Sequence, residues 1–478
     1  MRIILALTIV LLSYSSFCQL SKAEKKVIKE IDDKGDEYFS IAKQIWDLAE
    51  VGYQEEKSSA LLQEALGNEG FQIKKGVAEI PTAFVASYGE GSPVIGILGE
   101  YDALPGITQT NSPEREERTD VNAGHACGHH LFGSGSAAAA IAIKNWMAEE
   151  NIQGTVRFYG TPAEEGGAGK VYLVRAGLFE DVDAVLHWHP SNGNSADAAS
   201  SLANKSAKFR FYGQSSHAAG SPWNGRSALD GVEAMNYMVN MMREHMTAES
   251  RTHYVITKGG EAPNVIPDFA EVFYYVRHPD MKLAADNFER VVQCAEGAAL
   301  GTGTKMEYEI IHGIFNVLPN VALSQVVHDK LSLVGGVKYS DEEKEFAEKI
   351  VSSFSYGDNV TIESAERVNP FKVIRKGQGG STDVGDVSWV VPTAGLRTAT
   401  WVAGTSAHSW QAIAAGGTSI GKKGMIVAAK TIALSAMHLF ENQDILNTAK
   451  IELIEQRGKD FVYKPLLGDR EPPLDYRK

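Results

Sequence analysis

PVIGIL, residues 93–98, is a short and almost wholly apolar run of the kind that forms a buried strand. An alanine-rich helical stretch at residues 131–148 follows it, and TVRFY at residues 155–159 is the next strand. The pattern continues with a helix whose last part is residues 171–177. A strand at residues 183–186 follows it. Strands that alternate with helices over short connections predict an α/β domain with a mostly parallel sheet.

The pattern changes near residue 204. KFRFYG (208–213), HYVIT (253–257), AEVFYYVR (270–277) and MEYEII (306–311) read as strands, with helices expected at residues 228–249 and 284–299. The resulting strand–helix–strand–strand–helix–strand order is that of a ferredoxin-like α+β domain. We therefore predict an inserted domain at residues 204–316, which divides the catalytic domain into residues 19–203 and 317–478.

Composition places the chain among soluble globular proteins. Of its 478 residues, 44% are hydrophobic and 22% are charged, and the formal net charge is −14. A chain this acidic repels phosphate backbones and anionic lipids, so we expect neither a nucleic-acid partner nor a membrane-surface role. After the first residues, no stretch is apolar enough to predict a membrane span.

The N-terminus reads as a targeting signal. Arg2 supplies a positive charge, residues 3–12 are an apolar run, and Ser16 and Cys18 are small residues that flank a cleavage site. We predict a signal peptide at residues 1–18 and a periplasmic or secreted protein. Lipidation at Cys18 is the alternative, but Phe17 just before it fits that motif poorly.

Cleavage would leave two cysteines, Cys127 and Cys294. One pair cannot form a disulfide framework in a chain this long. Cys294 lies in a helical pattern typical of a packed core position. We expect Cys127 to be a reduced metal ligand rather than half of a disulfide.

Four short stretches collect most of the chemically capable side chains. They are GHACGHH (124–130), TPAEEGG (161–167), HWHP (187–190) and AHSW (407–410). Each follows a predicted strand or leads into a helix, and loops at the carboxyl ends of parallel strands meet at one edge of the sheet. Thiolate, imidazole and carboxylate are the ligands of zinc and similar divalent ions. Beside such a site, one of Glu164 and Glu165 would bind metal and the other would carry a proton.

With GEYDALPG (99–106), GSTDVGDVSWVVPT (380–393) and GTSAHSWQ (404–411), these stretches resemble the aminobenzoyl-glutamate hydrolase branch of the co-catalytic metal amidohydrolases. Hippurate hydrolases and plant auxin-conjugate hydrolases are relatives. The likeness covers nearly the whole chain after the signal. It implies a metallopeptidase-like catalytic domain, an inserted dimerisation domain, a homodimer and two divalent metal ions, zinc or manganese.

The resemblance also implies residue roles. Cys127 would bridge the two metals, with His129, Glu165, His189 and His408 as further ligands. Glu164 would be the general base. His217, in GQSSHAAGSP (213–222), would reach across the dimer to polarise the scissile carbonyl, and Asn264 and Arg277 would hold the substrate's carbonyl or carboxylate.

Other residues near these motifs stay open. Relatives carry Asp or Asn where this chain has His130, and His187 is a further imidazole beside His189. Asp102 is expected to orient a ligand. The sequence does not decide whether Asp383 and Asp386 line the pocket or cap a helix.

Three classes of function compete. The favoured one is a metal-dependent amidohydrolase that cleaves N-acyl amino acids or aminobenzoyl-glutamate-like amides, with a dipeptidase or aminoacylase of the same family as runner-up. A thiol hydrolase with Cys127 as nucleophile would leave Glu164, Glu165 and His408 without a role. A non-catalytic binding protein would have no use for a proton carrier such as Glu164.

Overall fold

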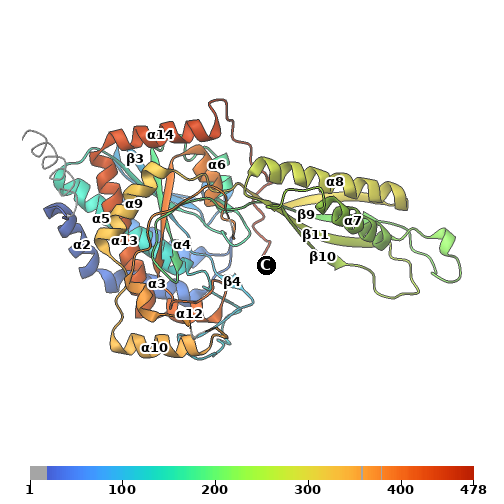
Figure 1. Cartoon of the computed structure of the whole chain (residues 1–478), viewed down its shortest axis with the longest axis horizontal. Coiled ribbons are helices and arrows are strands. Elements are labelled where there is room, and N and C mark those ends of the chain that lie inside the picture. The colour runs from blue at the N-terminus through green and yellow to red at the C-terminus, as the bar shows by residue number, and fades with distance from the viewer. Residues whose placement is uncertain (1–18, 357–358, 378, 478) are drawn as a thin grey trace, which may run out of the picture.

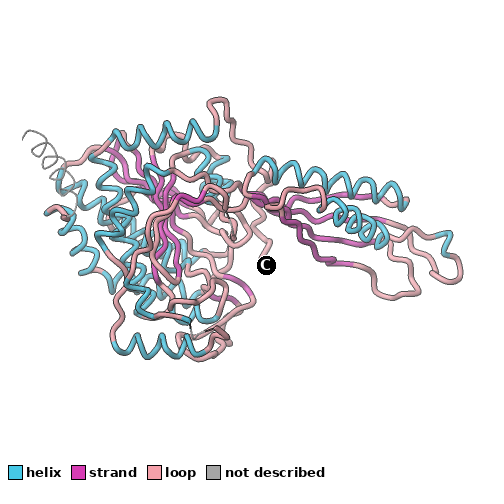
Figure 2. Tube along the Cα trace, in the orientation of Figure 1, coloured by secondary structure: helices cyan, strands magenta, loops and turns pink. Residues whose placement is uncertain are grey.

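The computed structural model describes residues 19–356, 359–377 and 379–477, so the predicted signal peptide lies outside the described residues. The chain forms a large rounded body and a narrower one that extends from it (Figure 1). Strands lie in the interior of the large body, and helices surround them (Figure 2).

The large body is built on one six-stranded sheet with the order β1-β2-β6-β3-β7-β14. Its strands are β1 (Gln72–Lys75), β2 (Phe84–Glu90), β6 (Gly154–Gly160), β3 (Val94–Gly99), β7 (Ala184–Ser191) and β14 (Thr393–Ala399). Strands β6, β3, β7 and β14 are parallel, whereas β2 and β1 add an antiparallel edge. The predicted mostly parallel α/β sheet is confirmed. The antiparallel edge was not predicted, because β1 is short and mostly polar.

Two long helices fill the centre of this body. Helices α5 (His129–Glu150) and α13 (Ser419–Glu441) pack against each other and against the sheet. The remaining α-helices of the large body are α2 (Lys22–Asp33), α3 (Gly35–Leu48), α4 (Glu56–Asn68), α6 (Gly169–Arg175), α9 (Val321–Val334), α10 (Asp341–Ser352), α11 (Val384–Val390), α12 (Trp410–Gly416) and α14 (Gln443–Arg457). Two short strand pairs, β4 (Leu104–Pro105) with β5 (Ala123–Gly124) and β8 (Ala198–Ala199) with β13 (Val373–Ile374), tie loops together.

Helix α13 is the one described helix that is long and apolar enough to cross a membrane. Its most apolar window is 83% buried inside the protein. That burial is what a central core helix needs, because such a helix is apolar on every side.

The narrow body is an antiparallel sheet with the order β10-β11-β9-β12, covered on one face by two helices. Its elements are β9 (Ala203–Tyr212), α7 (Ala228–Arg243), β10 (Arg251–Lys258), β11 (Phe269–His278), α8 (Met281–Thr302) and β12 (Lys305–Ile314). Their order along the chain is the predicted ferredoxin-like one. Phe209 and Phe288 are fully buried in a core separate from that of the large body. We call this body, residues 203–314, the inserted domain.

Two sequence expectations need correction. Helix α7 ends at Arg243 rather than at residue 249. His187 and His189 lie inside strand β7 rather than after it, because β7 stays paired with β14 as far as Ser191.

Candidate metal centre

Cys127 and His129 are positioned by the tight turn that begins α5. Gly128 between them is the N-cap of the helix and has a left-handed φ of 77°. A Cβ at this position would lie 2.7 Å from Cβ of Pro190, so the close approach to β7 requires glycine. The turn places Cys127 just before the helix and His129 as its first residue.

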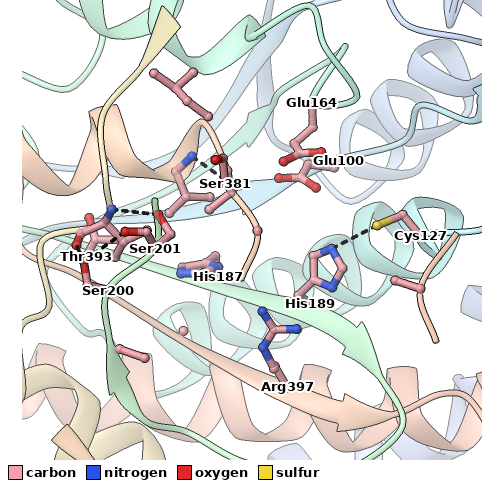
Figure 3. A pocket seen from close by; sticks show the side chains of 18 of the residues that line it. Glu100, Cys127, Glu164, His187, His189, Ser200, Ser201, Ser381, Thr393 and Arg397 are labelled. Atoms are coloured by element: carbon pink, nitrogen blue, oxygen red, sulfur yellow. Dashed lines mark hydrogen bonds between the residues drawn. The ribbon is translucent and has the colours of Figure 1, made fainter. Parts of the chain in front are cut away.

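His189 faces this turn from strand β7. Its Nε2 lies 3.5 Å from Sγ of Cys127, and its Nδ1 lies 2.7 Å from the carbonyl oxygen of Pro190. A proton on Nδ1 would be donated to that carbonyl, which leaves the Nε2 lone pair free toward Cys127. Figure 3 shows the two side chains pointing toward each other.

Glu164 and Glu165 lie in the loop between β6 and α6. The flanking Ala163 and Ala168 have left-handed φ angles of 59° and 58°, and His408 has one of 61°. Such angles are costly outside glycine and are concentrated at functional sites. Nε2 of His408 lies 3.5 Å from Oε1 of Glu165, so the AHSW stretch (407–410) contacts this loop.

The predicted ligands converge in two overlapping triads. The ligand atoms of Cys127, His129 and His189 all lie within 4.8 Å of one another, and so do those of Cys127, Glu165 and His408. Cys127 belongs to both triads, which is the arrangement a bridging ligand requires. The five residues come from four segments that are far apart in the sequence.

The site has the unsatisfied atoms that a cation would satisfy. Nε2 of His129 and Oε1 of Glu165 are buried and make no hydrogen bond, although Nε2 of His129 lies 3.1 Å from Oε2 of Glu100. Buried polar atoms are rarely left without partners, and both residues belong to the ligand triads. The donor set of one thiol, imidazoles and carboxylates fits a divalent ion of the zinc type.

The same volume carries strongly perturbed acids. Burial raises the pKa of the Glu164 carboxyl well above its usual range, and the negative charges of Glu100 and Glu165 add to the rise. Burial, with Glu165 beside it, also raises the pKa of the Cys127 thiol. A nearby cation would favour the ionised form of each group, because it compensates for the lost hydration.

Asp102 connects two of the ligand-bearing segments. Its Oδ1 lies 2.8 Å from Nδ1 of His129, and its Oδ2 accepts a hydrogen bond of 2.9 Å from the backbone N–H of Glu165. The carboxylate is fully buried and thereby fixes both the ring of His129 and the Glu165 loop. The structure thus supports the expectation that Asp102 orients a ligand.

Below the centre lies a buried ion-pair network that the sequence did not suggest. Nζ of Lys170 is 2.6 Å from Oε1 of Glu100 and 2.8 Å from Oδ1 of Asp383, and all three side chains are buried. Burial alone would lower the pKa of Lys170, but the two carboxylates raise it, so the lysine stays charged. A lysine that follows a glycine-rich stretch, in the first turn of α6, gives no sequence signal for such a role.

The structure shows the contacts of the residues whose roles the sequence did not decide. Nε2 of His130 lies 3.1 Å from the carbonyl oxygen of Gly416, away from the metal ligands. Asp383 pairs with Lys170. Asp386 accepts hydrogen bonds from the backbone N–H of Phe315 and from the hydroxyl of Tyr463, so it ties the start of the segment after the inserted domain to residues near the C-terminus. His187 lines the pocket beside the centre.

This pocket has a volume of about 650 Å³ and opens between the two bodies. Cys127, Glu164, Glu165, His189 and His408 line it together with Arg277 from the inserted domain. Figure 3 shows Glu164 and Glu100 above His189, and Arg397 reaching in from β14. Arg397 is a pocket residue that the sequence analysis missed, since one charged residue in a strand is usually solvent-exposed.

Three predicted residues do not line this pocket: His129, which is fully buried two positions after Cys127 in the sequence, and His217 and Asn264. His217 is exposed, and its Nδ1 accepts hydrogen bonds from the backbone N–H groups of Ala219 and Gly220. Asn264 is exposed beside it, and its carbonyl oxygen accepts a bond from the N–H of Ala218. The two residues lie together on the inserted domain, apart from the metal ligands of their own chain.

Both described cysteines, Cys127 and Cys294, are free thiols. Cys294 lies on α8 beside the core of the inserted domain, as its helical pattern predicted.

The family model of peptidase family M20/M25/M40 matches residues 96–395. The chain belongs to this family. Among its relatives is a p-aminobenzoyl-glutamate hydrolase chain of Escherichia coli, which is 40% identical over 439 residues, a match that covers 87% of this chain and 91% of the relative. The mouse Xaa-Arg dipeptidase is 29% identical, over 92% of this chain and 94% of that protein. As a member of the M20 family, the protein is a metal-dependent hydrolase.

Solved structures show the same fold. An aminobenzoyl-glutamate utilization protein from Klebsiella pneumoniae matches with a TM-score of 0.60 at 17% identity, over 86% of this chain and 97% of that one. A dinuclear metal-binding peptidase of the M20 family from Bacillus subtilis matches with a TM-score of 0.58 at 19% identity, over 86% and 99%.

We predict that Asp102→Asn weakens metal binding by about 10- to 100-fold, the usual effect of removing a residue that orients a ligand. Asparagine has one side-chain oxygen, so it can satisfy either His129 or the N–H of Glu165, but not both. Competition with a chelator of known affinity measures the loss. Asp181→Asn, which breaks an exposed ion pair with Arg157, is the control and should bind metal like the wild type. Equal affinity in both variants would contradict the role of Asp102.

Proposed function

We propose that this protein is a two-metal amidohydrolase that releases an acidic amino acid from an aminobenzoyl-glutamate-like conjugate. The observation that carries the proposal is the shared thiol of Cys127, which belongs to two ligand triads with Glu164 beside them. The Escherichia coli relative, which is 40% identical, is a p-aminobenzoyl-glutamate hydrolase chain. It supports an aminobenzoyl acyl group and a glutamate leaving group for this protein.

In this proposal Cys127 would be shared by the two ions. His129 and His189 would hold one of them, and Glu165 and His408 would hold the other. A third cluster, formed by Glu100 with His129 and Glu164, is not a further ion site, because Glu100 is already paired with Lys170. A thiolate ligand favours zinc by its softness, while the resemblance to the family admits manganese.

Bound metal would polarise the scissile carbonyl and lower the pKa of a water molecule. The chain's own part is to move the proton. Glu164 lines the pocket next to the triads but belongs to neither, so its carboxylate is free to accept the proton and deliver it to the leaving nitrogen. Its raised pKa suits a group that must hold a proton between these two steps.

The competing classes fit the site less well. A cysteine nucleophile needs a lowered pKa, whereas burial raises the pKa of the Cys127 thiol. A binding protein would not need Glu164 beside the ligands. A dipeptidase for C-terminal arginine is the runner-up, because of the mouse relative. Arg277 and Arg397 both line the pocket, and they favour an anionic leaving group over a cationic one.

We also propose that the active form is a homodimer built through the inserted domain. Most of the exposed large hydrophobic side chains of the described chain lie on this domain, among them Trp223, Tyr237, Met241, Val255 and Leu300. Strand β10 is an edge strand whose residues 253–258 are exposed, and an exposed apolar edge invites pairing with a second chain. Contact with a partner would also give a use to His217 and Asn264, which lie outside their own chain's pocket.

For localisation, we propose export to the periplasm or beyond the cell. The support is the predicted signal peptide at residues 1–18, and lipidation at Cys18 remains the alternative.

We predict that Glu164→Gln keeps nearly full metal content but hydrolyses N-(4-aminobenzoyl)glutamate at least about 100-fold more slowly, since it cannot accept the proton. Glu165→Gln, the matched control at the neighbouring position, should lose metal as well as activity. Metal analysis of the purified variants and release of 4-aminobenzoate measure the two effects. Equal metal loss in both variants would show that their roles are wrongly divided. An unchanged rate in Glu164→Gln would overturn the mechanism.

We predict that His217 acts in the active site of the partner chain. His217→Ala and Glu164→Gln homodimers should both be almost inactive. Their heterodimer would contain one site with both defects and one site with neither, so its activity should approach half that of the wild type. Purification with two different affinity tags ensures that only heterodimers are assayed. If His217 acts within its own chain, every site carries one defect, and the verified heterodimer stays inactive.

A further inference from the structure

Arg397 enters the pocket because of the register between two parallel strands. In this register Gly395 of β14 is paired with His187 of β7, and Arg397 with His189. Side chains two residues apart lie on the same face of a strand, so all four positions share the face that carries the metal ligand His189. Figure 3 shows Arg397 pointing toward the space between His187 and His189.

The glycine at position 395 is what allows this packing. A Cβ on Gly395 would lie 2.3 Å from Nε2 of His187, so any side chain there would displace the imidazole. The ring of His187 therefore lies over β14 next to Arg397. An imidazole carries no negative charge, so neither histidine compensates the charge of Arg397.

Arg397 has no acidic partner in the described parts of the chain. Within residues 19–356, 359–377 and 379–477, no ion pair and no side-chain hydrogen bond involves its guanidinium. Its side chain is exposed to the solvent of the pocket. A guanidinium offers a planar fork of donors that matches a carboxylate, and this one is open to a ligand.

A second unpaired arginine faces the same pocket from the other body. Val276 of β11 is buried under the helices of the inserted domain, so Arg277 next to it points to the open face of that sheet. Nε of Arg277 is buried without a hydrogen-bond partner, while the guanidinium lies 5.3 Å from the ring of Tyr275. Arg277 and Arg397 thus approach one cavity from two different sheets.

We propose that Arg397 binds one carboxylate of the leaving amino acid and that, with Arg277 binding the other, it makes the pocket selective for dicarboxylic amino acids. The inference rests on the proposed function and deepens it. A substrate with one carboxylate would leave one guanidinium without an anion. An N-acyl glutamate or aspartate supplies two. Asp197 also lines the pocket, but one of its oxygens accepts a hydrogen bond from the backbone N–H of Lys372.

Three substrates of equal size test this role: N-(4-aminobenzoyl)glutamate, its side-chain amide and its α-amide. Each amide lacks one of the two carboxylates. The wild type should prefer the diacid over both amides by about 10- to 100-fold in kcat/KM, the effect of one hydrogen-bonded charge pair. Arg397→Gln should lower kcat/KM by a similar factor for the diacid and for one amide. For the other amide, which already lacks the carboxylate that Arg397 binds, it should change little.

Arg375→Gln is the control, because Arg375 is exposed and does not line the pocket. It should leave all three values unchanged, and circular dichroism should show that Arg397→Gln is folded. If Arg397→Gln lowers the values for all three substrates by the same factor, or for none, the carboxylate-binding role is wrong. If the wild type hydrolyses none of the three, the proposed function fails instead, and the two failures are thereby distinguished.

Discussion

An excess of buried negative charge is the constraint on which the rest of this structure depends. Glu100, Asp102 and Asp383 are buried, and Glu164 and Glu165 lie in the same region at the edge of the pocket. Removing carboxylates from water is costly unless cations or hydrogen-bond donors compensate for the lost hydration. Lys170 forms ion pairs with Glu100 and Asp383, so its positive charge does not compensate the other acids. The negative charge that remains favours the binding of divalent ions.

The division of this charge explains the arrangement of the centre. Lys170 holds the acids on the sheet side, and Asp102 holds the His129 ring and the Glu165 loop. Buried groups therefore restrain the ligands in their positions. The same pocket also carries positive charge, since Arg277 and Arg397 both face the cavity. A substrate with its carbonyl at the metals and its carboxylates at the arginines would match both halves of this field.

Much of this could be predicted from the sequence, because the relevant signals are local or periodic. The alternation of strands and helices indicated the parallel sheet, and the order of the elements in the inserted domain followed from their periodicity. The four motifs that hold Cys127, His129, Glu165, His189 and His408 were recognisable from their ligand-type residues, whereas the role of each residue came from the resemblance to the family. The spacing of His187 and His189 also indicates one shared face, although the strand extends further than its apolar start suggested.

What the sequence did not reveal depends on contacts between distant segments. Lys170 looks like an ordinary surface lysine until the fold places it between Glu100 and Asp383, which are 283 positions apart in the sequence numbering. Arg397 becomes a pocket residue only through the register that pairs it with His189. His130 lies within a motif of ligands, yet its bond to the carbonyl of Gly416 directs it away from them. None of these contacts has a local signature.

Anomalous diffraction from crystals of the metal-loaded protein tests the central claim most directly. Data collected at the zinc and manganese absorption edges would locate each ion and identify it. The account predicts two ions in the pocket, with Sγ of Cys127 within bonding distance of both, about 2.3 Å for zinc. His129 and His189 should contact one ion, and Glu165 and His408 the other. A single ion, or two ions that Cys127 does not bridge, would contradict the account.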